Sequence, residues 1–317
     1  MATYKEIRGT KIQNFSSDPA NPVEGQVWYN TTSNTFKYFG VQAAAWATGG
    51  NLGTARFYLA GCGTQTAGLA FGGFPGPTAL VATEEYDGSA WTGGGNLATE
   101  RENPGGTGTQ TAGLAFGGGP SITNTEEYDG SAWATGGNLN TGRYNLGGCG
   151  TQTAGLAFGG SPGPTDEATE EYDGSSWTAG GNLGTGRNSL AGAGTQTAGL
   201  AFGGNDPSLT NVTEEYDGSS WTAGGNLNTA RKKLAGAGTQ TEGLAFGGGT
   251  PPLSNATEQY DGTSWTNTTS MSTAREHLAG FGTQTAGLAA GGYTGSGVDT
   301  TEEFTGGGPA TLTVGTD

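Results

Sequence analysis

The sequence predicts an all-β fold, a six-bladed β-propeller made of four-stranded blades. The main observation is one tract, Gly-Thr-Gln-Thr-Ala-Gly-Leu-Ala-Phe-Gly-Gly, that recurs six times with at most one change. The copies follow one another at steps of 42 to 45 residues and begin at Gly63, Gly108, Gly150, Gly194, Gly238 and Gly282. In most repeats a Tyr and then a Trp follow the tract in the same order. A period of this length with these glycine and aromatic positions is typical of a propeller blade.

Residues 231–266 illustrate how one blade is expected to form. Its four strands are predicted at 233–238, 243–246, 257–260 and from 264 onward. The second strand ends in a diglycine, and the loop 249–256 leads to the third strand. Asp261-Gly262 favours a tight hairpin turn into the fourth strand, because Gly readily adopts a positive φ. The same order of elements is expected in every repeat.

The outer strand shows how the ring is expected to close. Its Trp occurs six times, at Trp46, Trp91, Trp133, Trp177, Trp221 and Trp265. The third strand also occurs six times, but no Trp follows its last copy, 301–304. The N-terminal strand of Trp46 is therefore predicted to complete the C-terminal blade, which leaves no exposed strand edge at the seam.

Both ends of the chain lie outside the repeat. Residues 1–40 are expected to be an attachment segment with a β-hairpin, because the aromatic runs 26–30 and 35–39 flank a short polar turn. Residues 41–306 then form the propeller, and 307–317 are expected to be a C-terminal tail.

Composition excludes several classes of partner. The chain has 65 Gly among 317 residues and a formal net charge of −16. An acidic surface repels phosphate backbones, so we expect no nucleic-acid partner. No apolar run is long enough for membrane insertion, and no secretion signal is recognisable. Cys62 and Cys149 are expected to be small buried thiols of a protein that matures in a reducing cytoplasm.

Residues for catalysis are sparse, and we predict neither an enzyme nor a cofactor or metal site. His277 is the only histidine, and we expect it to be an exposed, variable residue. Carboxylate pairs such as Glu84-Glu85 recur in nearly every repeat, whereas a catalytic pair normally occurs once. We expect one Glu of each pair to face solvent and the other to form bidentate ion pairs that link adjacent blades, with Arg56, Arg101, Arg143, Arg187, Arg231 and Arg275.

The Gln of each Thr-Gln-Thr turn belongs to a predicted ring on one face of the disc. These residues are Gln65, Gln110, Gln152, Gln196, Gln240 and Gln284. They could hold a ligand on the axis, but we favour a structural role in which they satisfy backbone groups of adjacent turns.

The copies differ from one another mainly on the other face. The loop between the second and third strands differs almost completely from repeat to repeat, and so does the residue pair after each Arg. Both segments emerge on the same face of a four-stranded blade, and recognition usually resides in loops on a rigid scaffold. We therefore predict a ligand-binding face that includes Phe57, Tyr58, Phe74, Tyr144, Lys232, Lys233, His277 and Tyr293.

Two resemblances extend this interpretation. The diglycine, the Tyr after the loop and the later Trp resemble kelch repeats over about residues 41–305. Residues 21–30, followed by Phe36-Lys37-Tyr38, resemble lead-in segments of tail-fibre and other virion proteins of tailed bacteriophages. Kelch-type propellers include enzymes, adaptors and binding modules, so the first resemblance implies the fold and not the function.

Together the resemblances imply a non-enzymatic virion protein that is assembled in the host cytoplasm. Residues 1–40 would bind other virion proteins, and the variable face would bind a glycan or protein on the host surface. Two alternatives stay open: a propeller lyase or glycosidase that acts on polysaccharide, and a purely structural decoration or spacer protein. Assembly into a homo-oligomer also stays open.

Overall fold

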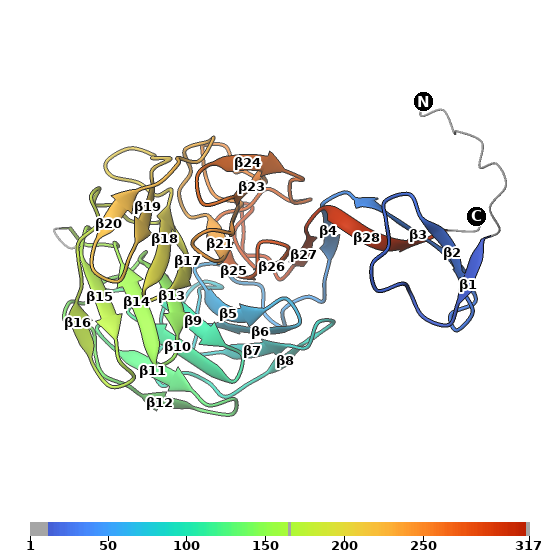
Figure 1. Ribbon diagram of the computed structural model, residues 1–317. Coiled ribbons are helices and arrows are strands. Elements are labelled where there is room, and N and C mark those ends of the chain that lie inside the picture. The colour runs from blue at the N-terminus through green and yellow to red at the C-terminus, as the bar shows by residue number, and fades with distance from the viewer. Residues whose placement is uncertain (1–11, 164–165, 315–317) are drawn as a thin grey trace. The chain divides into compact units, whose positions relative to one another are not determined.

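The computed structural model describes residues 12–163 and 166–314 (Figure 1). Residues 1–11 of the expected attachment segment, 164–165 of one variable loop and 315–317 of the expected tail lie outside the described residues. The chain divides into two compact units. Unit 1 comprises 1–44 and 306–317, and unit 2 comprises 45–305. None of the described segments forms an apolar helix of membrane-spanning length.

Unit 2 consists, in its described residues, of six four-stranded antiparallel sheets, which we number repeat sheets 1 to 6. Sheet 1 contains β5 (Ala60–Thr64), β6 (Ala67–Phe71), β7 (Thr83–Tyr86) and β8 (Trp91–Gly93). Sheet 2 contains β9 (Gly105–Thr109), β10 (Ala112–Phe116), β11 (Thr125–Tyr128) and β12 (Trp133–Thr135). Sheet 3 contains β13 (Gly147–Thr151), β14 (Ala154–Phe158), β15 (Thr169–Tyr172) and β16 (Trp177–Ala179).

The next two sheets repeat this order, and the last one differs. Sheet 4 contains β17 (Ala191–Thr195), β18 (Ala198–Phe202), β19 (Thr213–Tyr216) and β20 (Trp221–Ala223). Sheet 5 contains β21 (Ala235–Gly238), β22 (Gly243–Phe246), β23 (Thr257–Tyr260) and β24 (Trp265–Thr268). Sheet 6 contains β25 (Ala279–Gly282), β26 (Ala286–Ala290), β27 (Thr301–Thr305) and, from the start of the unit, β4 (Ala45–Thr48). In sheet 6, Trp46 lies opposite Phe304.

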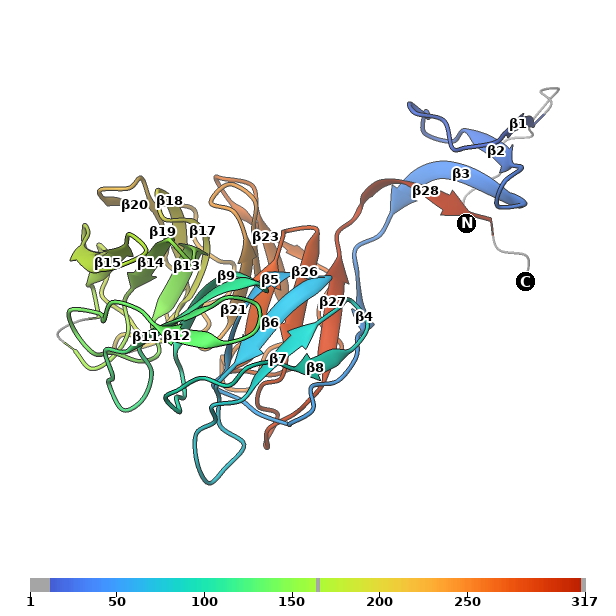
Figure 2. The same ribbon diagram turned by 90° about the horizontal axis from the view of Figure 1, so that it is seen from below.

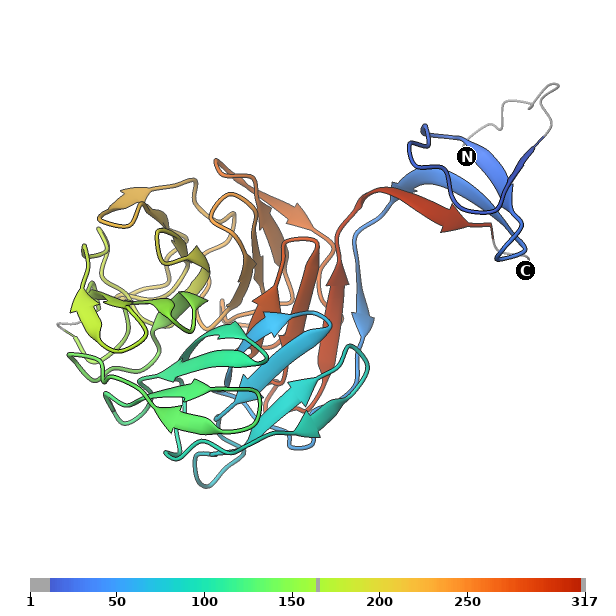
Figure 3. The same cartoon turned by 60° about the horizontal axis from the view of Figure 1, so that its bottom comes forward.

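The predicted all-β class and the repeat of four-stranded antiparallel sheets are confirmed, and the arrangement is propeller-like. In Figure 1 the first strand of each sheet lies toward the centre of unit 2 and the last strand toward the rim, and Figures 2 and 3 show this from two other directions. The first strands contact one another in the order β5, β9, β13, β17, β21 and β25, and β25 in turn contacts β5.

Small residues in the first strands allow this close packing. A Cβ added to Gly61 would lie 2.7 Å from the ring of Phe281 and 2.8 Å from the carbonyl oxygen of Leu69. Larger side chains occur one strand further out, where Leu69, Ala70 and Phe71 are completely buried between sheets. The thiols of Cys62 and Cys149 are free and buried, as expected, and burial raises the pKa of each to about 12.

Polar side chains join each repeat sheet to the sheet before it. Trp133 Nε1 donates a hydrogen bond to Thr83 Oγ1 at 2.9 Å. Gln110 Nε2 donates to the carbonyl oxygens of Gly68 and Tyr86 at 3.1 and 2.7 Å. The equivalent Trp and Gln residues make the same contacts at every junction. The Gln side chains thus satisfy backbone groups, as the favoured structural role predicts, but these groups belong to strands of a neighbouring sheet and not to adjacent turns.

The arginines are more deeply buried than expected, and the prediction of bidentate ion pairs is wrong. All six have no exposed surface, and each lies 2.5 to 2.9 Å from one oxygen of a third-strand Glu. In sheet 1, Nη2 of Arg56 donates to Oε1 of Glu84, and Nη1 donates to the carbonyls of Gly72 and Ala82. Oε2 of Glu84 accepts a hydrogen bond from Gly53 N at 2.6 Å. The guanidinium is divided between a carboxylate and two strand ends because the carboxylate also binds backbone amides.

The link between adjacent sheets runs through the backbone of each arginine. The carbonyl of Arg101 accepts a hydrogen bond from Gly73 N of sheet 1, whereas its guanidinium contacts Glu126 of sheet 2. The equivalent backbone bond is present for all six arginines. Each arginine therefore ties the segment that crosses between two sheets to both of them.

One Glu of each pair was expected to face solvent, but the second Glu does not do so. Glu127 Oε1 accepts a hydrogen bond from the hydroxyl of Tyr172 in the following sheet at 2.5 Å, and four further junctions have the same bond. Burial and this carboxylate raise the pKa of Tyr172 to about 12. At the junction between sheets 5 and 6 the partners are instead Gln259 and Phe304, so donor and charged acceptor are both replaced.

Unit 1 contains one four-stranded sheet in the order β1 (Gln13–Phe15), β2 (Val27–Asn30), β3 (Thr35–Gln42), β28 (Gly308–Thr313). β2 and β3 pair antiparallel around the turn 31–34. Trp28 is completely buried, and its Nε1 donates to Asp18 at 3.0 Å. The C-terminal segment differs from the expected tail, because β28 pairs along most of β3.

The Glu–Tyr junctions lead to a prediction about stability. Replacing Tyr172 by Phe leaves the half-buried Glu127 carboxylate without its donor, and we expect a loss of about 1–3 kcal/mol in the free energy of unfolding. In a Glu127→Gln background the same change should cost much less, because Gln259 and Phe304 already form such a junction. Urea unfolding of the parent, both single variants and the double variant measures the coupling. An equal effect of Tyr172→Phe in both backgrounds would contradict the assignment.

Candidate functional site

Six equivalent residues form a ring where the crossing segments approach the first strands. We call Tyr58, Asn103, Asn145, Ser189, Lys233 and His277 the axial ring. Each has a positive φ, between 51° and 60°. The backbone N–H of each donates to the carbonyl of the preceding member, and Tyr58 N donates to His277 O, with distances of 2.7 to 3.1 Å. The backbone groups are therefore satisfied among themselves.

The arginines position the axial ring. Each member follows a buried Arg by two residues, so the crossing segment is fixed directly before it. The residue between them pairs with the start of a variable loop. Phe57 bonds to Phe74 in both directions, and the bridges Tyr144–Ser161, Asn188–Asn205, Lys232–Gly249 and Glu276–Tyr293 are equivalent. The two variable segments identified in the sequence are thus bonded to each other.

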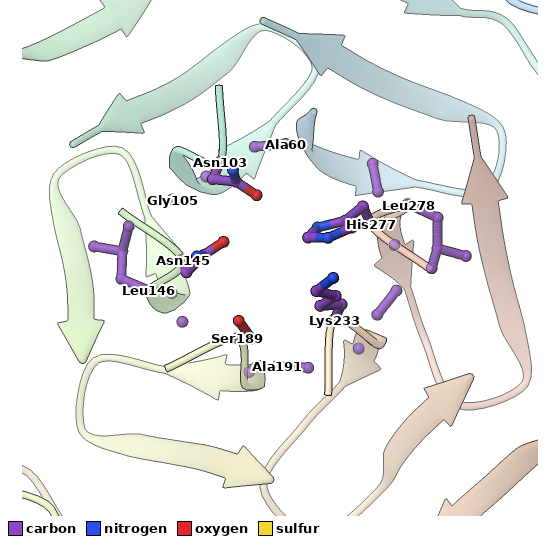
Figure 4. Close-up of a pocket in the computed structure, with 18 of the residues that line it drawn as sticks. Ala60, Asn103, Gly105, Asn145, Leu146, Ser189, Ala191, Lys233, His277 and Leu278 are labelled. Atoms are coloured by element: carbon purple, nitrogen blue, oxygen red, sulfur yellow. The ribbon is translucent and has the colours of Figure 1, made fainter. Parts of the chain in front are cut away.

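The ring surrounds an axial pocket of about 140 Å³. Figure 4 shows the side chains of Asn103, Asn145, Ser189, Lys233 and His277 pointing toward its centre. The start of each first strand lines the wall, with Leu146 and Ala60 among its residues. A second hollow, of about 100 Å³, lies further along the first strands and is lined largely by Gly. Polar side chains are therefore concentrated in the first pocket.

The expectation that His277 is exposed is wrong. Its side chain is only 7% exposed. Its ring packs edge-on against Tyr58, with 3.9 Å between the ring centroids. Burial, together with Lys233 and Lys232, lowers the pKa of His277 to about 2, so its imidazole is neutral at physiological pH. Among the described residues, Nε2 of this buried imidazole has no hydrogen-bond partner.

Most of the predicted aromatic residues gather on one side of the ring. The ring of Phe57 lies 4.6 Å from Tyr58, 5.7 Å from Phe74 and 5.1 Å from Tyr293, centroid to centroid. All four side chains are half-buried. Tyr144 occupies the position of Phe57 in sheet 3 and is not part of this cluster.

The two lysines lie on the same crossing segment but in different surroundings. Lys233 belongs to the axial ring, and its Nζ lies 3.1 Å from Glu276 Oε1. Lys232 pairs through its backbone with Gly249 of the adjoining loop. The predicted residues therefore fall into the axial ring, the aromatic cluster and isolated positions.

The prediction of binding residues missed half of the axial ring. Asn103, Asn145 and Ser189 line the pocket together with Tyr58, Lys233 and His277. They belong to the variable pair after each Arg, but the predicted binding face includes only aromatic and basic residues. Their equivalent position in the repeat, the second residue after each Arg, was the signal that could have identified them.

The chemistry of the pocket is that of hydrogen bonding. Among residues 12–163 and 166–314, no three His, Cys, Asp or Glu side chains gather as metal ligands would. The sequence matches no protein-family model and no curated protein.

The buried imidazole leads to a prediction about pH. Unfolded His277 binds a proton below about pH 6.5, whereas the folded form stays neutral to about pH 2, so stability falls as the pH falls. We expect acidification from pH 7.5 to 4 to destabilise the parent more than His277→Asn, by at most about 3 kcal/mol. Asn tolerates the positive φ, and acidic groups elsewhere affect both proteins alike. Urea titrations at each pH measure the difference, and parallel curves would contradict the burial of His277.

Proposed function

We propose that this protein is a non-enzymatic adhesion protein of a tailed-bacteriophage particle, whose unit 2 recognises a glycan or protein on the host surface. The observation that supports this most is the bonding of the variable segments to one another. The residue pairs after the arginines and the variable loops meet around one polar pocket, while the Gln and Trp positions keep the same contacts at every junction. Variation restricted to one rigidly supported surface is typical of recognition.

The proposal includes a finer description of the fold. Unit 2 is proposed to be a closed, six-bladed propeller of the kelch type, with the Trp46 strand completing the last blade. Two observations support closure: the cyclic contacts of the first strands and the cyclic hydrogen bonds of the axial ring. The pairing of β4 with β27 supports the assignment of the seam.

Unit 1 is proposed to attach the protein to other virion proteins. The large apolar side chains that are exposed among the described residues all belong to this unit: Ile12, Val23, Phe36, Tyr38, Val41 and Val314. Exposed apolar groups gathered in one small unit are typical of a surface that binds another protein. The resemblance of residues 21–30 to virion lead-in segments agrees with this role.

Closure can be tested by two variants that differ only in β4. Residues 45–305 contain this strand and residues 49–305 lack it. Without it, β27 keeps an unpaired edge, and the contacts of Trp46 with Phe246 and Phe304 are lost. We expect the shorter variant to be at least about 3 kcal/mol less stable and to aggregate. Thermal unfolding and light scattering measure both effects. Equal stability of two monomeric variants would disprove closure through this strand.

The binding face can be tested on host cells. Replacing Phe57, Tyr58 and Phe74 by Ala should weaken cell attachment at least about tenfold, because aromatic rings contribute strongly to sugar and protein contacts. Replacing Gln65, Gln152 and Gln240 by Ala should lower stability instead, because each donates two hydrogen bonds to a neighbouring sheet. Both sets are compared in a cell-binding assay at equal folded fraction. Loss of attachment in the Gln set alone would place recognition on the opposite face.

A further inference from the structure

We propose that the axial pocket binds one neutral sugar unit, held by the polar side chains of the axial ring. This inference rests on the proposed role of the variable face in recognition and narrows it to one site and one class of ligand. The site is the pocket of about 140 Å³ that Figure 4 shows. The hydrogen-bonding groups, the charge balance and the volume of the pocket each favour such a ligand.

The polar groups of the ring match hydroxyl groups. The amides of Asn103 and Asn145 and the neutral imidazole of His277 can each both donate and accept hydrogen bonds. The hydroxyl of Ser189 donates to Asn188 Oδ1 at 3.0 Å and can still accept a hydrogen bond. A sugar hydroxyl has the same double capacity. A carboxylate or a phosphate mainly accepts hydrogen bonds, and a cation interacts mainly with acceptor atoms. Either kind of ligand would therefore use only some of the donors and acceptors of the ring.

The charges around the pocket cancel. The twelve residues that follow the six arginines in pairs include two Lys, 232 and 233, and two Glu, 102 and 276. Lys233 is paired with Glu276 at 3.1 Å, and His277 is neutral. The whole chain carries a net charge of −16, which disfavours the approach of an anion. A neutral ligand needs no compensating charge here.

One buried group in the ring has no partner. Nε2 of His277 makes no hydrogen bond to any of the described residues, although only 7% of the side chain is exposed. Leaving a buried polar nitrogen unpaired is unfavourable, and a ligand hydroxyl would remove that cost. Nε2 has almost no accessible surface and lies 4.0 Å from Glu276 Oε1, so the imidazole must shift slightly to meet the hydroxyl. Figure 4 shows this imidazole pointing toward the centre of the pocket.

The size and one wall of the pocket also suit a sugar ring. At about 30 Å³ for each water molecule, a volume of about 140 Å³ has room for roughly five waters, which suits a single sugar unit better than a longer chain. Tyr58 adds an aromatic side chain to the wall, next to His277. Aromatic rings stack on the apolar C–H face of a sugar while neighbouring polar groups bind its hydroxyls. We therefore expect the sugar to contact Tyr58 and His277 together.

The single histidine allows a direct test. Because His277 is the only histidine in the chain, its imidazole gives one set of NMR signals that report on the pocket. The probes are D-glucose, D-galactose, D-mannose and N-acetyl-D-glucosamine, with sodium D-glucuronate and inorganic phosphate for comparison. We expect at least one neutral sugar to shift the imidazole signals in a saturable way and to bind more tightly than either anion. If no neutral sugar shifts them, or if an anion binds more tightly, the proposal is wrong.

The variant that tests the ring is designed to fold normally. Asn103→Gly with Asn145→Gly removes two amides at positions where φ is positive, which glycine adopts without strain. Ser121→Gly is the matched control, since Ser121 has φ 67° and does not line the pocket. We expect the double variant to bind the sugar at least about tenfold more weakly at unchanged melting temperature, and the control to bind as the parent does. Undiminished binding by the double variant, or an equal loss in the control, would overturn the assignment.

The same experiments separate this inference from the proposed function. If no sugar binds while replacement of Phe57, Tyr58 and Phe74 still abolishes cell attachment, the axial pocket is not the sugar site, but the face remains the recognition surface. If sugar binds at the ring and cell attachment survives every variant of the face, the pocket is a sugar site and the proposed role in adhesion fails.

Discussion

The buried arginine of each repeat is the interaction on which the rest of unit 2 depends. It has no exposed surface, and its carbonyl accepts a backbone bond from the sheet before. In five repeats its guanidinium joins a carboxylate to the two strand ends of one sheet, whereas Arg187 binds its carboxylate and the carbonyls of Thr185 and Ala201. Removing one partner of such a buried pair typically costs about 3–5 kcal/mol, because the remaining charge stays in a poorly solvated environment. Two residues further along, the chain reaches the axial ring. The arginine that joins neighbouring sheets therefore also fixes the positions of the pocket residues.

Hydrogen bonds between sheets explain how a chain with 32% hydrophobic residues forms a packed unit. Each junction buries a Leu and a Phe or Ala of the second strand, and it adds bonds from Trp and Gln and, at five junctions, from Tyr. The junction between sheets 5 and 6 lacks the Tyr–Glu bond, and there both partners differ: Phe304 replaces the Tyr and Gln259 replaces the Glu. A buried carboxylate without a donor is costly, whereas an amide at the same place finds another backbone partner, the carbonyl of Gln284.

In each residue of the axial ring, the backbone has a structural role and the side chain is free for a chemical one. Its backbone groups bond to one another around the axis, so the side chains are not needed for the hydrogen bonding of the fold. The same position can therefore hold an amide, a hydroxyl, an ammonium, an imidazole or a phenol. A non-glycine residue with positive φ costs free energy unless its surroundings fix it, and here the cyclic backbone bonds fix all six residues. This freedom of the side chains, on a fixed backbone, is what a recognition site requires.

The sequence by itself determined the all-β class, the order of four strands in each repeat and the surface on which variation is concentrated, because these follow from local periodicity and from comparing the copies. It identified the arginines, the tryptophans and the glutamines as structural for the same reason. Only the tertiary structure decided their partners: a guanidinium divided between a carboxylate and carbonyls, a Glu bonded to a Tyr of the next sheet, a strand at 308–313, and a buried His277. Asn103, Asn145 and Ser189 lie tens of residues apart and look unremarkable in isolation. They become one site only because each crossing segment brings its residue to the same axis, and distances between such segments are not encoded in any local pattern.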